Sequence, residues 1–178
     1  MTTTFRSAIA AEIGWTWQDH VGQSPIVDSN RHAFQQSLAD GSGLDQCDAV
    51  WHVQDQPLPA GQSTILNLDL LEQTLFGNAI VIPLAKVKAI LIENRSEAAG
   101  GYLLVGGAPV DAWSAPFGAA GDTIRVMPQS PLLLANTHDG WPLDAGAALR
   151  LAAVGQDVIY SVAILGTLAD SSSSGSGD

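Results

Sequence analysis

Apolar and polar residues alternate with a period of two along most of the chain, a pattern typical of β-strands. The clearest run extends from Phe5 to Trp17, where the odd positions are largely apolar. We expect one long strand here, or two strands joined by a bulge near Gly14. Thirteen residues is long for a strand, so this segment is suited to overhang its own domain as an arm that reaches a neighbouring subunit.

Residues 19–48 are the least regular part of the chain and are rich in Asp, Ser, Gln and Gly. Phe34 and Leu38 fit either a short helix or a strand, and the pattern does not decide between them. In the later segment 86–93, alternation places Val87 on the same side as Ala89. That segment begins with two lysines and ends in apolar residues, which predicts a central strand that starts solvated and ends buried on both faces.

Short apolar runs then follow one another, separated by Gly and Pro turns and without a long helical pattern. They cover residues 49–53, 64–70, 79–82, 86–93, 102–105, 123–127, 131–135, 148–154 and 158–165. This spacing predicts an all-β protein, an antiparallel β-sandwich or jelly roll. We expect an N-terminal strand or arm at 1–18, a β-sandwich domain at 19–168 and a flexible Ser/Gly-rich tail at 169–178.

The charge balance narrows the classes of partner. The 178 residues include 18 acidic and only 7 basic side chains, which gives a formal net charge of -11. A chain this acidic is repelled by a phosphate backbone and by an anionic membrane surface, so we expect no nucleic-acid and no membrane partner. Neither a signal-peptide pattern nor a run of 18 apolar residues is present in the sequence. Charged residues make up 14% of the chain, which suggests that neighbours cover part of the surface.

The sequence contains little that is typical of an enzyme. Its single cysteine, Cys47, excludes an intrachain disulfide and is typical of a small buried side chain. The histidines form no H-x-H pair, and the Gly-Ser-Gly at 41–43 lacks the context of a nucleophile elbow. We therefore expect no enzymatic activity, no cofactor and no metal. Two alternatives stay open: a divalent metal held by His52, His138 and an acidic residue, and an irregular calcium site in the acidic segment 40–48.

Five tryptophans form the more informative set. Trp113 lies in the loop sequence DAWSAPFG, and Trp141 follows the turn in HDGWP. Core packing is the commonest role of tryptophan, but loop tryptophans also anchor protein interfaces or stack on sugars. The candidate interface or ligand-stacking residues are Trp15, Trp17, Trp113 and Trp141.

Several strand and turn segments, taken together, point to a known family. They are ADGSGLDQCDAVWH at 39–52, the LxLDLLxxxLFGN pattern at 66–78, KVKAILIEN at 86–94, VGGA at 105–108, PQSPLLL at 128–134 and VIYSVAILGT at 158–167. The chain resembles, over roughly residues 34–167, the small all-β virion proteins encoded among the head and tail genes of tailed bacteriophages. The resemblance implies a structural role and provides no active-site residues.

We therefore expect a non-enzymatic virion structural protein that is made in the host cytoplasm. Its charge would be repelled by packaged DNA, so we expect a capsid decoration protein on the particle exterior. The expected partners are further copies of itself, as a homo-oligomer, and a major capsid, neck or tail protein, met through β-edge and apolar contacts. The alternative is a carbohydrate- or receptor-binding β-sandwich module in which Trp113 and Trp141 stack on the ligand.

Overall fold

The computed structural model describes residues 5–21, 24–75, 77–97, 99–143 and 146–169, and its regular elements are all strands. The strands are β1 (Ser7–Val21), β2 (Ser24–Leu38), β3 (Ala49–Leu58), β4 (Ser63–Asn67), β5 (Leu71–Leu75), β6 (Asn78–Ile82), β7 (Leu84–Asn94), β8 (Tyr102–Gly106), β9 (Thr123–Val126), β10 (Ser130–Ala135), β11 (Trp141–Pro142), β12 (Ala148–Val154) and β13 (Val158–Leu168). Every pairing between these strands is antiparallel. The prediction of an all-β antiparallel protein is confirmed.

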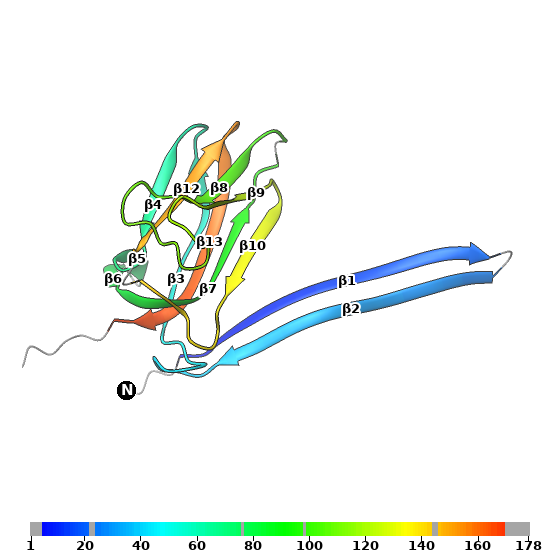
Figure 1. Cartoon of the computed structure of the whole chain (residues 1–178), viewed down its shortest axis with the longest axis horizontal. Helices are drawn as coiled ribbons and strands as arrows, with labels where there is room; N and C mark the ends of the chain where they lie inside the picture. Colours follow the sequence, from blue (N-terminus) through cyan, green and yellow to red (C-terminus); the bar gives the residue numbers. More distant parts are fainter. Residues whose placement is uncertain (1–4, 22–23, 76, 98, 144–145, 170–178) are drawn as a thin grey trace, which may run out of the picture.

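Two sheets form the body of the molecule (Figure 1). The larger sheet has the strand order β10-β7-β13-β3, with β11 also paired to β7. The smaller sheet has the order β4-β12-β8-β9, and β5 pairs with β6 in a separate two-stranded hairpin. We call the two packed sheets the sandwich. Among the described residues there is no helix with the length and apolar character needed to cross a membrane.

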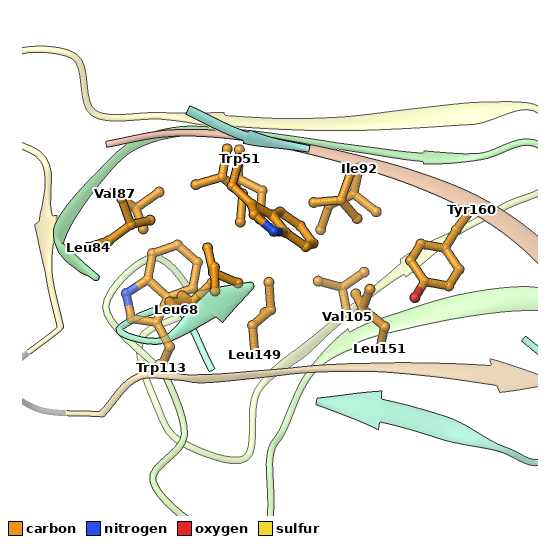
Figure 2. Close-up of a cluster of buried hydrophobic side chains, with 14 of the residues drawn as sticks. Trp51, Leu68, Leu84, Val87, Ile92, Val105, Trp113, Leu149, Leu151 and Tyr160 are labelled. Atoms are coloured by element: carbon orange, nitrogen blue, oxygen red, sulfur yellow. The ribbon is translucent and has the colours of Figure 1, made fainter. Parts of the chain in front are cut away.

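The core lies between the two sheets (Figure 2). Trp51 of β3 and Ile92 of β7 face Val105 and Leu149 of the smaller sheet, and all four are at most 4% exposed. Each such side chain contributes about 1.5–3 kcal/mol when it is removed from water. The indole Nε1 of Trp51 also donates a 2.8 Å hydrogen bond to the carbonyl of Glu72, which ties the larger sheet to β5.

A β-bulge in β7 changes which side chains face this core. Gly166 of β13 pairs with Val87, and the preceding Leu165 pairs with Ala89, so Lys88 has no partner in β13. The extra residue shifts the alternation by one position. Val87 therefore lies in the main core, whereas the sequence pattern placed it on the same side as Ala89. Lys88 is only 1% exposed, so the prediction that this strand starts solvated was wrong.

Strands β1 and β2 form a long hairpin, which we call the arm, that projects away from the sandwich (Figure 1). Each strand has 15 residues, and Gly14 pairs with Arg31 in an unbroken register, so β1 contains no bulge. Residues 24–38 form a strand and not a helix. The arm thus extends to residue 38 instead of ending at residue 18, and the tail at 170–178 lies outside the described residues.

Candidate interaction surface

The arm has one apolar and one polar face. Residues that pair directly across an antiparallel hairpin share a face. The pairing of Ile13 with His32 and of Ala11 with Phe34 therefore defines one face, and the pairing of Glu12 with Ala33 lies on the other. The apolar face of the arm carries Ile9, Ala11, Ile13, Trp15, Trp17, Ile26, Phe34 and Leu38. The same face also holds seven polar residues, mostly on β2 and near the tip: Ser7, Asp19, Ser24, Asp28, Asn30, His32 and Gln36.

Most of this apolar face is open to solvent. Ile13 is 74% exposed, Trp17 is 57% exposed and Phe34 is 50% exposed. Isolated exposed apolar residues are ordinary on a protein surface, but a continuous stripe of them marks an interaction surface. The stripe on the arm is therefore the main candidate functional feature of the described residues.

Side-chain contacts across the hairpin hold the arm in shape. On the polar face, Arg31 forms an ion pair with Glu12 at 3.7 Å, and the hydroxyls of Thr16 and Ser29 lie 3.2 Å apart. On the apolar face, the Trp15 indole stacks on the His32 ring with centroids 5.7 Å apart. These contacts join the two strands to each other, so the apolar stripe is presented as one continuous surface.

At its base, the arm packs on the outer face of the larger sheet. Ile9 and Leu38 are 5% and 3% exposed and form a small cluster with Cys47 and Ala89. The cluster also contains the partly buried side chains of Phe5, Leu133 and Leu165. Burial raises the pKa of the Cys47 thiol, which donates hydrogen bonds to the carbonyls of Ala49 at 3.3 Å and of Gly166 at 3.1 Å. The cysteine is thus a packing residue beneath the arm.

Polar contacts fix the other strand of the arm to the loops of the sandwich. The Nε2 of Gln36 donates to Asp45 Oδ1 at 3.1 Å, and the Thr137 hydroxyl donates to Gln36 Oε1 at 2.6 Å. Asp45 Oδ2 lies 3.0 Å from His138 Nδ1. We call Gln36, Asp45, Thr137 and His138 the arm-base network. It links β2 to two separate loops and so helps to set the direction in which the arm leaves the sandwich.

Lys88 joins β7 to the two loops of the arm-base network. Its ammonium group donates to the backbone carbonyls of His138 at 2.7 Å and of Gly43 at 3.1 Å. Desolvation lowers the pKa of Lys88, and the nearby charge of Lys86 lowers it further. Lys86 in turn forms a 2.7 Å ion pair with Asp139, and this hydrogen bond lowers the pKa of the Asp139 carboxyl. The bulge that buries Lys88 thus places both lysines next to the loops that contact the arm.

A second apolar surface lies on the outer face of the larger sheet. The strand registers align Leu133, Leu91, Ala163 and His52 in one row across β10, β7, β13 and β3. Three residues of this row, all but Leu133, line an open depression of about 360 Å³, which we call the outer hollow. Its lining residues are Val50, His52, Val53, Gln54, Leu91, Glu93, Ser161, Val162 and Ala163. Ala163 is exposed and Val50 is 39% exposed. The sandwich thus presents apolar side chains on both sides of its larger sheet.

The four candidate tryptophans fall into two groups. Trp15 and Trp17 lie on the apolar face of the arm and are 41% and 57% exposed. Trp113 is only 2% exposed and makes edge-to-face contacts with Phe117 and with the half-buried Trp141, each at 6.1 Å between centroids. Trp113 therefore packs in the core and has no free face for a ligand, which corrects the prediction of a stacking pair on the loops.

The two histidines considered as metal ligands lie in different places. His52 lines the outer hollow, whereas His138 belongs to the arm-base network. In the segment 40–48, Asp45 binds side chains of that network and Asp48 accepts a 2.8 Å hydrogen bond from the amide of Leu168. In the part of the chain that the structure describes, no group of three His, Cys, Asp or Glu residues is arranged to hold a metal ion.

The second strand of the arm was missed at the level of sequence. Ile26 and Phe34 share the apolar face with Ile13, but Asp28, Asn30 and His32 interrupt the alternation between them. A local signal was present, because 24–38 contains no glycine and its single proline stands at the start of the strand. That signal is weak compared with an uninterrupted period of two.

Comparisons with known proteins identify no family for this chain: no family model matches it, and no curated protein is similar to it.

Proposed function

We propose that this protein is a non-enzymatic structural subunit of a virion, a capsid decoration protein on the particle exterior. The observation that supports this proposal most directly is the exposed apolar face of the arm. Such a surface is unfavourable in water on a free monomer and becomes favourable when a neighbour covers it. A hairpin with 15 residues in each strand reaches roughly 50 Å, far enough to contact a subunit beside its own.

The net charge supports an exterior location. The net charge of -11 disfavours contact with packaged DNA, and the chain has only 7 basic residues with which to bind phosphate. The partners that we propose are further copies of this chain and a major capsid, neck or tail protein. A jelly-roll arrangement of the sandwich is part of the same proposal, supported by a five-stranded and a four-stranded sheet whose neighbouring strands are mostly not consecutive in sequence.

The test is the protein composition of purified particles from the phage that encodes this chain. Mass spectrometry should detect the polypeptide at a fixed ratio to the major capsid protein. A double variant of the apolar face, Ile13→Asp with Phe34→Asp, should be lost from the particles. A matched variant of the polar face, Gln18→Asp with Gln35→Asp, should be retained. Wild-type particles without the polypeptide would contradict the proposal.

The alternative is a carbohydrate- or receptor-binding module, for which the exposed Trp15 and Trp17 are now the relevant residues. Both indoles lie on one face of the arm, where they are accessible to a sugar ring. Trp15→Ala with Trp17→Ala should then abolish retention on immobilised glycans and leave the thermal midpoint of the sandwich nearly unchanged. No retention of the wild-type protein by any glycan would remove this alternative.

A further inference from the structure

We propose that the apolar face of the arm packs into the outer hollow of a second copy of this chain. This inference rests on the proposed structural role and names the two surfaces and the partner involved. Four observations support it, and they concern the base of the arm, the shape of the larger sheet, the reach of the arm and the distribution of charge.

At its base, the apolar face of the arm already packs on the outer face of the larger sheet of the same chain. Ile9 is buried against Ala89, together with Leu133 and Leu165, all on the outer face of the larger sheet. A cavity of about 360 Å³ continues from there, lined by residues 8–10 of the arm and by Leu91 and Ala163 among others. The apolar face of the arm therefore already packs on the outer face of the larger sheet within one chain.

The outer hollow extends this contact surface beyond the reach of the chain's own arm. It shares Leu91 and Ala163 with the cavity at the arm base and continues to Val50 and His52 on β3. Within the ranges that the structure describes, no other segment covers this part of the sheet. The outer face of the larger sheet thus carries one apolar strip, which the arm covers at one end and which is exposed to solvent at the other.

The part of the arm beyond Ile9 carries apolar residues that suit the outer hollow, but it does not lie against the hollow of its own chain. Ile13 and Phe34 share the face of Ile9, and Ile13 is about 13 Å farther along the strand. The arm carries them away from its own sandwich (Figure 1). The free apolar face and the open hollow thus complement each other but are separated within one chain. A second copy brings them together, with each arm on the larger sheet of the other copy.

The other segments of this chain do not suit the hollow. Residues 1–4 are MTTT and residues 170–178 are DSSSSGSGD, so neither sequence can supply a large apolar surface. Charge also favours this contact between two acidic copies. The only carboxylates on the apolar face of the arm, Asp19 and Asp28, lie near its tip, and Glu93 is the only carboxylate that lines the hollow. Few carboxylates therefore face each other where these surfaces meet, which limits the repulsion between the copies.

The size of the surfaces is sufficient for a stable pair. The free part of the apolar face, residues 11–21 of β1 with the paired part of β2, is roughly 35 Å long and about 10 Å wide, an area of about 350 Å². A two-fold pair covers two such faces and the surfaces beneath them, which exceeds the roughly 1,000 Å² that a specific interface requires.

The test is disulfide cross-linking between two singly substituted proteins of different mass. One carries Ile13→Cys in the arm, the other carries Ala163→Cys in the hollow, and the native Cys47 is buried and serves as the common background. The control replaces Ile13→Cys with Thr16→Cys, on the polar face of the same strand. Because each protein has one new thiol, a mixed dimer on a non-reducing gel can form only between copies.

A mixed dimer from Ile13→Cys and Ala163→Cys, at least ten-fold more abundant than the control dimer, supports the proposal. An excess of Ile13→Cys homodimer would overturn it in favour of arms that pack on each other. Equal yields with the control would also overturn it. Light scattering of the wild-type chain covers the case in which a cysteine variant fails to fold. A mass at or above twice 18.5 kDa that Ile13→Asp reduces to one chain supports the proposal, and a monomer at every concentration overturns it.

The particle experiment separates this inference from the proposed function. If the chain is present in particles but forms no mixed dimer, the structural role stands and the pairing of arm and hollow is wrong. If the mixed dimer forms but the chain is absent from particles, the pairing stands and the virion role is wrong.

Discussion

The ammonium group of Lys88 donates a 2.7 Å hydrogen bond to the backbone carbonyl of His138, and this bond connects a central strand of the sandwich to the arm-base network. Lys88 is 1% exposed, and its second partner is the carbonyl of Gly43. A buried lysine normally requires compensation for its desolvated charge. Here two carbonyls from separate loops provide that compensation, so one side chain holds both loops against the sheet.

Replacing Lys88 should therefore destabilise the fold. We expect Lys88→Met to lower the free energy of unfolding by about 1–3 kcal/mol, because the carbonyls of Gly43 and His138 lose a charged donor and stay partly buried. The matched control is Lys86→Met, which removes an exposed ion pair with Asp139 and should lower stability clearly less than Lys88→Met, because solvent screens this pair. Urea denaturation measures both values. Equal losses in the two variants would contradict this role of Lys88.

The buried thiol of Cys47 should make stability depend on pH in the alkaline range. Burial raises the pKa of Cys47 above its ordinary value of 9.0, so above pH 9.0 the folded chain retains a proton that the unfolded chain releases. This contribution to stability is complete below the ordinary pKa and is lost as pH rises through the folded pKa.

The measurement compares wild type with Cys47→Ser by urea denaturation between about pH 8 and pH 10.5. Serine does not ionise in this range, so the difference in stability between the two proteins should shrink as pH rises. The pKa of Tyr160 is also raised by desolvation, and it contributes the same pH dependence to both proteins. A difference that stays constant across this range would contradict the prediction.

Gly166 should tolerate no side chain, whereas Gly14 should accept one. A Cβ at Gly166 would meet the carbonyl oxygen of Lys86 and, at 3.1 Å, a methyl group of Leu84. Gly166→Ala should cost about 1–3 kcal/mol, since the neighbouring backbone of β7 must move. At Gly14 the nearest atom would be Arg31 Cβ at 3.7 Å, an ordinary contact. Gly14→Ala should therefore change stability by no more than about 0.5 kcal/mol, and thermal denaturation distinguishes the two outcomes.

The arm-base network should determine how firmly the arm is attached. Gln36→Ala removes the hydrogen bonds to Asp45 and Thr137, and we expect amide exchange at the base of β1 and β2 to become about ten-fold faster. Gln35→Ala is the matched control, because Gln35 lies on the opposite face and is exposed. Hydrogen exchange with mass spectrometry measures both. An unchanged rate in Gln36→Ala would show that the apolar cluster around Ile9 alone holds the arm.

Local alternation was sufficient to predict most strands of the sandwich and the first strand of the arm, but not β2 or the position of every side chain. The segment from Phe5 to Trp17 could be read as a strand with one apolar face because side chains on a strand alternate whatever surrounds it. The same rule failed in β7, where the bulge at Lys88 moved Val87 into the core. A bulge is defined by pairing with a strand about 80 residues away, so it leaves little trace in the local pattern.

The tryptophans also show that the local sequence does not determine whether a side chain is buried. Trp113 and Trp15 are chemically identical, yet Trp113 is 2% exposed in the core and Trp15 is 41% exposed on the arm. Neighbouring residues alone did not distinguish a loop that folds inward from a strand that extends outward. Burial depends on which segments pack together, and those contacts are between residues distant in sequence.

By itself, the sequence determined the all-β class, the presence of a long first strand and the acidic balance, because these depend on composition and on neighbouring residues. Only the tertiary structure decided that residues 24–38 pair with the first strand, that Lys88 is buried and that the arm and the outer hollow both present apolar surface. The physical reason is that strand pairing and burial are set by long-range contacts, and a local pattern records which faces are apolar without recording what they meet.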